Sequence, residues 1–222
     1  MNIFEHIVRF FQGGGFMMYP IAAVLVLGIA IAVERWIYLS HAALRNRGLW
    51  SQIAPLLAQG NFRQAVQMTS RSHAAIGQIL SYGLARVTSA RRRDDIEKAM
   101  EESLMDVVPR LEKRTHYIAT FANVATLLGL LGTVIGLINA FAAVATVNPA
   151  EKANLLSASI SVAMNCTAFG LITAVPLLLT HALLQTKTTE LIDSLEMASV
   201  KFLNAVTERA LPEQQRAAAE RA

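Results

Sequence analysis

Three long stretches of the chain contain no Asp, Glu, Lys or Arg, and they constrain its fold more than any other feature. They span residues 10–33, 115–150 and 153–186. A membrane-spanning helix needs about 20 consecutive apolar residues, and a soluble domain of 222 residues has no interior large enough for three such helices. We therefore predict an all-α integral membrane protein. Its three transmembrane helices are expected at residues 16–39, 116–147 and 154–186.

The composition excludes several other classes of protein. Hydrophobic residues make up 54% of the chain and charged residues only 16%, which is the opposite of intrinsic disorder. Cys166 is the only cysteine, so a disulfide scaffold is excluded. The sequence has no phosphate-binding loop, no Cys-x-x-Cys and no His-Glu-x-x-His motif. We therefore expect no enzyme activity, cofactor or structural metal. We also expect no nucleic-acid partner, because the basic residues flank the apolar stretches instead of forming a basic domain.

The distribution of Lys and Arg predicts how the chain is oriented in the membrane. Most of these residues lie between the first and second apolar stretches or after the third, whereas the link between the second and third has only Lys152. Positive charge is retained on the cytoplasmic side. We expect a cytoplasmic helical loop at residues 40–115, a short periplasmic link at 148–153 and a cytoplasmic helical tail at 187–222.

The residues before the first membrane helix have an apolar and a polar face. This pattern over residues 2–12 is typical of a helix that lies in the plane of the membrane interface. We therefore expect a periplasmic amphipathic helix within residues 1–15, ended by three glycines that let the chain turn into the membrane. The first membrane helix runs into Glu34-Arg35 instead of a small-residue cleavage site, so we predict an uncleaved span with the N-terminus outside.

The cytoplasmic parts show helical periodicity and no alternating strand pattern. Short amphipathic helices are predicted at residues 50–58, 62–69 and 76–87. Another helix starts near Asp94 and continues into the second membrane helix, with a kink at Pro109. The third membrane helix also continues into the cytoplasm, and the tail from Pro212 onward is expected to fray. The two extensions are expected to be long rods that enclose a cavity below the membrane.

Small and polar residues mark the second and third membrane helices. Gly129, Gly132 and Gly136 allow helices to approach closely, and packing alone is one interpretation of them. Hydroxyl and amide side chains on these helices suit a polar seam or a pore, although a single hydroxyl usually bonds to its own backbone. The candidate ion-pathway residues are Thr126, Thr133, Ser161, Asn165 and Thr167.

Neither of these two membrane helices contains an Asp or a Glu. A proton relay or a cation site inside a membrane normally uses a carboxylate. The chain therefore offers hydroxyl groups but no carrier of a proton. If it conducts ions, we expect a partner protein to supply the acid.

Two motifs stand in order in these helices. The first is Leu-Gly-Leu-Leu-Gly-Thr-Val-Ile-Gly at 128–136, and the second is Asn-Cys-Thr-Ala-Phe-Gly-Leu-Ile-Thr-Ala-Val-Pro at 165–176. Together with Glu34-Arg35 at the end of the first span, they resemble the MotA/TolQ/ExbB proton-channel family. Three spans, an outside N-terminus and a large loop after the first span place the chain nearer to ExbB and TolQ than to the four-span MotA stators.

This resemblance implies a motor subunit in the bacterial inner membrane. Members of the family form a homopentamer around two single-span helices of an ExbD- or TolR-like partner, whose membrane aspartate carries the ion. Thr133 and Thr167 match the threonines that face this aspartate. The proton motive force then drives envelope or outer-membrane work, such as TonB-dependent import, through a TonB- or TolA-like protein.

One position departs from the pattern of the family. ExbB and TolQ commonly carry a Glu five residues before the third-helix threonine, and here that residue is Val162. A sodium-driven motor of the same family, with transient sodium at Thr133 and Thr167, is therefore an alternative. A membrane scaffold that conducts nothing and a transporter or membrane enzyme with an unrecognised site are the others. Membrane lipids are expected partners, and the triplet at 91–93 is interpreted either as an anionic-lipid site or as a solvated loop.

Overall fold

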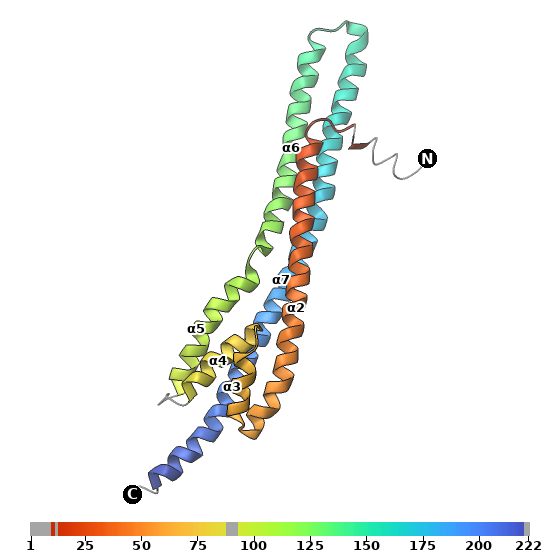
Figure 1. Ribbon diagram of the computed structural model, residues 1–222. Coiled ribbons are helices and arrows are strands. Elements are labelled where there is room, and N and C mark those ends of the chain that lie inside the picture. Colours follow the sequence, from red (N-terminus) through yellow and green to blue (C-terminus); the bar gives the residue numbers. More distant parts are fainter. Residues whose placement is uncertain (1–9, 12, 88–92, 220–222) are drawn as a thin grey trace. The chain divides into compact units, whose positions relative to one another are not determined.

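The computed structural model describes residues 10–11, 13–87 and 93–219, and its regular elements there are all α-helices. Their order is α2 (Met18–Gln59), α3 (Phe62–Ser70), α4 (Ala75–Val87), α5 (Arg93–Glu112), α6 (Thr115–Val144) and α7 (Pro149–Ala219) (Figure 1). Three helical segments, in α2, α6 and α7, are long and apolar enough to span a membrane. The predicted all-α fold with three membrane helices is confirmed. Most of the predicted interfacial helix, and Arg91 and Arg92, lie outside the described residues.

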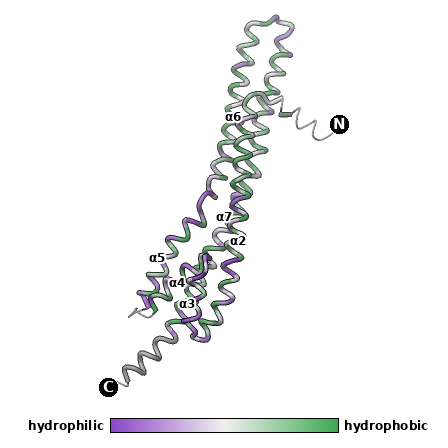
Figure 2. Tube along the Cα trace, viewed as in Figure 1, coloured by the Kyte–Doolittle hydropathy of each residue, from purple (hydrophilic) through white to green (hydrophobic). Residues whose placement is uncertain are grey.

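The described chain divides into two compact units. The first comprises the described residues of Met1–Arg35 and Arg114–Leu184, and therefore the first part of α2, all of α6 and the first part of α7. The second comprises those of Trp36–Lys113 and Gln185–Ala222, with α3, α4, α5 and the remaining parts of α2 and α7. Apolar residues dominate the helices of the first unit, whereas polar residues are frequent in the second (Figure 2).

In the first unit, the three apolar helices pack around a small core. Ile21, Ala125 and Cys166 are buried where α2, α6 and α7 meet. Large apolar side chains on the outer faces are exposed, and Phe141 and Ile172 expose 64% and 60% of their surface. Exposure of this kind along whole helices is unfavourable in water, so these faces are suited to lipid or to other chains.

The connection between α6 and α7 is shorter than the sequence predicted. α6 ends at Val144 and α7 begins at Pro149, so residues 149–153, assigned above to the link, are helical. Proline suits the first position of a helix because its missing N–H would have no helical partner there. Glu151 in the first turn complements the positive end of the helix dipole.

In the second unit, the predicted helices at 62–69 and 76–87 are confirmed as α3 and α4. The side chain of Asn61 caps α3 by accepting a hydrogen bond of 3.3 Å from the backbone nitrogen of Gln64. Phe202 of α7 is fully buried, and a Cβ atom on Gly83 of α4 would lie 2.8 Å from its ring. Any larger residue at position 83 would force this ring, and the Met100 side chain beside it, to shift.

α2 is longer than the sequence predicted, and the end of α7 is more regular. α2 runs without interruption to Gln59, where a separate helix was expected at 50–58. Gly48 precedes the start expected for that separate helix, and one glycine costs about 1 kcal/mol, too little to end a packed helix. α7 continues as predicted from the third membrane helix, and it extends to Ala219, where fraying was expected after Pro212. The alanines of this tail favour a helix.

The helix predicted to run from near Asp94 through the second membrane span is interrupted. α5 ends at Glu112 and α6 begins at Thr115, and Arg114 between them has a left-handed backbone with a φ of 68°. The sequence predicted a kink at Pro109, but the chain leaves the helix several residues later. The Arg114 guanidinium also forms an ion pair of 3.4 Å with the Glu34 carboxylate at this uncommon backbone conformation.

Candidate functional site

α6 and α7 approach each other along a row of small residues in the first unit. A Cβ atom on Gly129 would lie 3.3 Å from the Cα atoms of Gly170 and Thr167. A Cβ atom on Gly170 would lie 2.8 Å from the backbone oxygen of Ala125, closer than real Cβ atoms approach. The two backbones are therefore in direct contact, and this contact depends on glycine in both helices.

Gly132 and Gly136 extend the same contact toward the end of α6. A Cβ atom on Gly136 would lie 2.8 Å from the Cβ of Ala163, and one on Gly132 would overlap the side chain of Cys166. Gly132 also faces the residue just before α2, since a Cβ there would lie 3.3 Å from the Cβ of Met17. All three glycines singled out in the sequence thus lie where α6 meets α7.

Thr167 lies at the centre of this contact. Its hydroxyl donates a hydrogen bond of 3.0 Å to the backbone oxygen of Gly129, which joins α7 to α6. The hydroxyl of Thr180, by contrast, donates to Pro176 in its own helix at 2.8 Å, the usual pattern in membrane helices. The Thr167 side chain is half-buried, and its oxygen keeps lone pairs that can accept a hydrogen bond or bind a cation.

Thr126 lies three residues before Gly129 and Thr133 lies four residues after it, so all three share one face of α6. The Thr126 hydroxyl donates to the backbone oxygen of Ala122 at 3.2 Å, and that of Thr133 to Leu130 at 2.6 Å. Thr126 is exposed and Thr133 is half-buried. Each oxygen can therefore still accept a hydrogen bond from another chain.

The threonines turn away from α2. Gly132 faces Met17, just before α2, and successive residues of a helix are rotated by about 100°, so its neighbour Thr133 points away from this segment. On α7, Cys166 packs against Ile21 of α2, and its neighbour Thr167 turns away in the same manner. The hydroxyl groups therefore gather on the flank of the α6–α7 pair that α2 leaves open.

Ser161 and Asn165 lie elsewhere on α7. The Asn165 amide donates a hydrogen bond of 3.4 Å to the backbone oxygen of Gly13, in the segment before α2. Ser161 is exposed one turn earlier. Residues two apart on a helix are rotated by about 200°, so Asn165 and Thr167 point to different sides. The structure brings three of the five predicted ion-pathway residues together and separates the other two from them.

Val162 occupies the position at which ExbB and TolQ commonly have Glu. Its side chain lies close to the segment before α2, because its Cγ1 atom is 3.3 Å from the place of a Cβ on Gly15. Gly15 itself has a φ of 72°, which glycine adopts without strain. In this chain, position 162 therefore faces Gly15. It does not face Thr126, Thr133 and Thr167, which we call the threonine group.

Thr173 is a polar residue of α7 that the site prediction left out. It is fully buried, and its hydroxyl oxygen has no hydrogen-bond partner among the described residues. An unsatisfied hydroxyl in a membrane bundle is unusual, because no bulk water is present to bond to it. Its spacing of seven residues from Cys166, which faces the core, is the sequence signal that would have predicted its burial.

Acidic residues are absent from the middle of the described membrane helices. In the described part of the first unit, the acids are Glu34 and Glu151, near the ends of their apolar stretches. Glu34 pairs with Arg114, and about half of each side chain is exposed (45% and 51%). This ion pair was not predicted, since the two residues are far apart in the sequence. The threonine group thus has no carboxylate beside it within the described chain.

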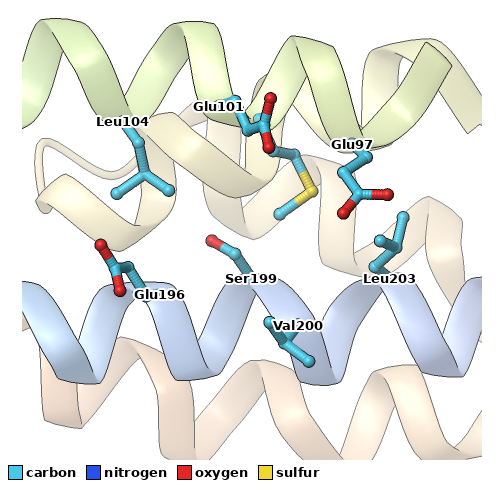
Figure 3. A pocket seen from close by; sticks show the side chains of 8 residues that line it. Glu97, Glu101, Leu104, Glu196, Ser199, Val200 and Leu203 are labelled. Atoms are coloured by element: carbon cyan, nitrogen blue, oxygen red, sulfur yellow. The ribbon is translucent and has the colours of Figure 1, made fainter. Parts of the chain in front are cut away.

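In the second unit, α5 and α7 border a groove of about 260 Å³ (Figure 3). The groove has apolar lining residues and three acidic ones, which are Glu97, Glu101 and Glu196. The extensions of the second and third membrane helices therefore lie beside each other here. Among the described residues, no three His, Cys, Asp or Glu side chains are grouped so that they could hold a metal ion.

The first unit has three apolar helices, and two of them, α6 and α7, are in backbone contact at glycines with hydroxyl groups alongside. This arrangement defines a helical membrane protein with a polar seam between its spans. The chain belongs to the MotA/TolQ/ExbB proton channel family, whose model matches residues 71–197. This match contains α4, α5 and α6, both sequence motifs and the greater part of α7.

Individual relatives extend the similarity over most of the chain. An ExbB homologue of Methanothermobacter thermautotrophicus is 26% identical over 199 residues, which cover 89% of this chain and 69% of that protein. An ExbB-like protein of Synechocystis is 25% identical over 169 residues, or 76% of this chain and 80% of that one. Biopolymer transport protein exbB1 of Vibrio cholerae is 26% identical over 179 residues, which cover 78% of this chain and 76% of that protein. The family predicted from the motifs, and its ExbB-like branch predicted from the three spans, are confirmed.

Proposed function

We propose that this chain is the channel-forming subunit of an ion-driven motor in the bacterial inner membrane. Five copies surround the membrane helices of an ExbD- or TolR-like partner, and the partner's aspartate carries the ion past the threonines of α6 and α7. The proton motive force then drives envelope work, such as TonB-dependent import with a TonB- or TolA-like protein. Membership of a proton channel family and similarity to biopolymer transport proteins support this proposal.

The observation that carries the proposal is the threonine group beside a helix contact that has no acid. A hydroxyl accepts a hydrogen bond from a protonated carboxyl and donates one to a carboxylate, so it serves both states of a proton carrier. Thr133 and Thr167 lie on the flank that α2 leaves open, where a neighbouring chain can reach them. A membrane carboxylate from a partner completes such a site.

Sodium is the second candidate ion, because Val162 stands where the family commonly has Glu. The threonine oxygens on this flank are hard oxygen ligands, which are suited to an alkali cation as well as to hydrogen bonding. A partner aspartate together with Thr133 and Thr167 supplies such oxygens. This alternative changes the ion but leaves the architecture and the proposed motor role as they are.

Ion flux into lipid vesicles tests the function. We expect the chain reconstituted alone to conduct neither protons nor sodium, because its membrane helices lack a carrier, and we expect flux when the single-span partner is present. A partner with its membrane aspartate changed to asparagine is the control and should abolish the flux. Equal flux with and without the partner would contradict the proposal.

The oligomeric state gives a second test. The open flank of the α6–α7 pair exposes hydroxyl groups that one subunit cannot cover, so we expect a homopentamer in detergent or nanodiscs. Mass measurement of the intact complex checks this expectation. A stable monomer under conditions that preserve the membrane helices would show that it is wrong.

The orientation in the membrane gives a third test. We expect the segment of α5 to lie in the cytoplasm and the link before Pro149 to lie in the periplasm, according to the distribution of basic residues. Protease added outside intact spheroplasts should therefore leave residues 97–114 uncut. Cleavage there by the external protease would refute the proposed topology.

A further inference from the structure

A pocket of about 400 Å³ lies in the second unit, between the extension of α2, the start of α4 and α7. It is distinct from the threonine group, which belongs to the first unit. Its lining combines apolar side chains with groups of both charges. The apolar ones include Leu44, Trp50, Ile76 and Leu191, and the polar ones are Asn46, Arg47, Lys187, Glu190 and Ser194.

Asn46 is the polar group of this pocket that most needs a ligand. Only 4% of its surface is exposed, and its side-chain oxygen accepts a hydrogen bond of 3.2 Å from the backbone nitrogen of Ile76 in the first turn of α4. This bond fixes the orientation of the amide and leaves its nitrogen, Nδ2, inside the structure. Nδ2 has no hydrogen-bond partner among the described residues. A buried donor without an acceptor is costly, so an acceptor from a bound molecule stabilises this arrangement.

Two residues with cationic side chains line the same pocket as Asn46. Arg47 follows Asn46 directly on α2, and Lys187 lines the pocket from α7. The Lys187 ammonium is held in place, since it donates to the Ser40 hydroxyl at 2.9 Å and lies 3.8 Å from the centre of the Trp36 ring. An ammonium has three donors, so Lys187 can bond to a further acceptor. A guanidinium, an ammonium and an amide N–H that meet at one pocket suit a phosphate.

Glu190 makes the pocket unsuited to a simple anion. Its carboxylate lines the same space as Arg47 and Lys187, and it would repel a phosphate that carried no positive charge of its own. A molecule with a phosphate and an ammonium group a short distance apart satisfies both sets of charges. The apolar wall beside them matches the glycerol backbone and the beginning of the acyl chains.

The position of the pocket along α2 is compatible with a lipid headgroup. Trp36 and Tyr38 follow the charged pair Glu34-Arg35 at the end of the apolar stretch of α2, where aromatic residues mark the membrane–water interface. The first lining residue, Ala43, lies seven residues after Trp36, a distance of about 10 Å along a helix. Lys187 reaches from the pocket to the level of Trp36 itself. The pocket therefore opens next to the headgroup layer.

We propose that this pocket binds the headgroup of an aminophospholipid, phosphatidylethanolamine, with its phosphate at Asn46, Arg47 and Lys187 and its ammonium at Glu190. The bound phosphate gives the Asn46 nitrogen its missing acceptor. The lipid also bridges α2 to α7 at the place where α4 begins. The proposal does not depend on ion conduction by the first unit.

Lipid retention by the intact chain tests the proposal. The full-length protein is purified in detergent with an equimolar mixture of phosphatidylethanolamine, phosphatidylglycerol and phosphatidylcholine of matched acyl chains, and the bound lipids are counted by native mass spectrometry. We expect phosphatidylethanolamine to be retained in preference to the other two. Phosphatidylglycerol lacks the ammonium, and the quaternary ammonium of phosphatidylcholine has no N–H to donate to Glu190.

Three variants locate the binding. Asn46→Asp keeps the oxygen that caps α4 but replaces the free donor with a carboxylate, and Arg47→Ala removes an exposed cation; each should lower retention of phosphatidylethanolamine about tenfold. Arg45→Ala is the matched control, since Arg45 is also an exposed cation of α2 but does not line the pocket. Glu190→Gln should abolish the preference over phosphatidylglycerol. Equal retention in Asn46→Asp, Arg47→Ala and Arg45→Ala overturns the proposal.

Soluble ligands distinguish the source of the phosphate. Phosphoethanolamine at millimolar concentration should displace the bound lipid, which supports recognition of the headgroup. Strong binding of phosphoethanolamine or inorganic phosphate to a chain that retains no lipid assigns the pocket to a soluble ligand and overturns the lipid. A preference for phosphatidylglycerol over phosphatidylethanolamine in the wild-type chain overturns the role of Glu190.

Discussion

Gly170→Ala is expected to destabilise the packed membrane helices strongly, although it adds only one methyl group. The new Cβ would lie 2.8 Å from the backbone oxygen of Ala125 and 3.0 Å from the Cα of Gly129. Both are backbone atoms, which cannot move unless α6 and α7 separate. Overpacking of this kind costs about 1–3 kcal/mol. We expect a clearly lower midpoint of thermal unfolding in detergent, measured by circular dichroism.

Gly48→Ala is the matched control for this substitution. Gly48 lies within α2, and a Cβ atom there would have no neighbour within 4 Å. Alanine favours a helix over glycine by about 1 kcal/mol, so this variant should unfold at the same temperature as the wild type or at a higher one. A Gly170→Ala protein as stable as the Gly48→Ala protein would mean that α6 and α7 do not touch as closely as described.

The difference between these two glycines marks the limit of what the sequence predicts about packing. The spacing of Gly129, Gly132 and Gly136 indicated a close approach of α6 to another helix, since small residues at helical spacing form one face. The partner helix could not be read from this pattern. Gly170, the residue that contacts Gly129, was visible in the sequence as part of a motif but not as its partner.

The ion-pathway residues were chosen by chemical type, and the structure sorts them by direction. Hydroxyl and amide groups in a membrane helix are equally suited to a polar seam, so their chemical type offered no reason to prefer Asn165 or Thr167 as an ion-pathway residue. Which of them reaches the open flank depends on the rotation of α7 about its own axis. The contact of Cys166 with the core sets this rotation, and that contact exists only when three helices are assembled.

The break at Arg114 and the burial of Asn46 were beyond prediction for a related reason. Each coincides with a contact between residues distant in sequence, Arg114 with Glu34 and Asn46 with Ile76. Local helix propensity contains no information about such pairs. The order of the helices and the positions of the apolar runs, which depend on local sequence, were predicted far better than the exact ends of the helices.

Thr133→Val and Thr167→Val are expected to reduce ion-driven work severely while leaving the subunit folded. Valine has nearly the shape of threonine but no hydroxyl, so each variant removes a hydrogen-bonding group from the open flank of the α6–α7 pair. Thr133 bonds only within its own helix, so we expect no change in its unfolding midpoint. Thr167→Val loses the bond to Gly129 and should be slightly less stable, by about 1 kcal/mol.

The functional loss should be much larger than this change in stability, and that difference is what identifies a role in the ion pathway. A partner carboxyl that loses one hydrogen-bonding group in a buried setting loses about 1–3 kcal/mol, or roughly a 5- to 150-fold change in the occupancy of that state. Flux into vesicles with the partner present, measured under a proton gradient and under a sodium gradient, gives the readout. Thr167→Ser restores the hydroxyl and should restore flux, and Thr180→Val, which removes a hydroxyl bonded within α7, should leave it unchanged. Normal flux in both Thr133→Val and Thr167→Val under either gradient would show that these threonines do not contact the ion carrier, even if the subunit is part of a motor.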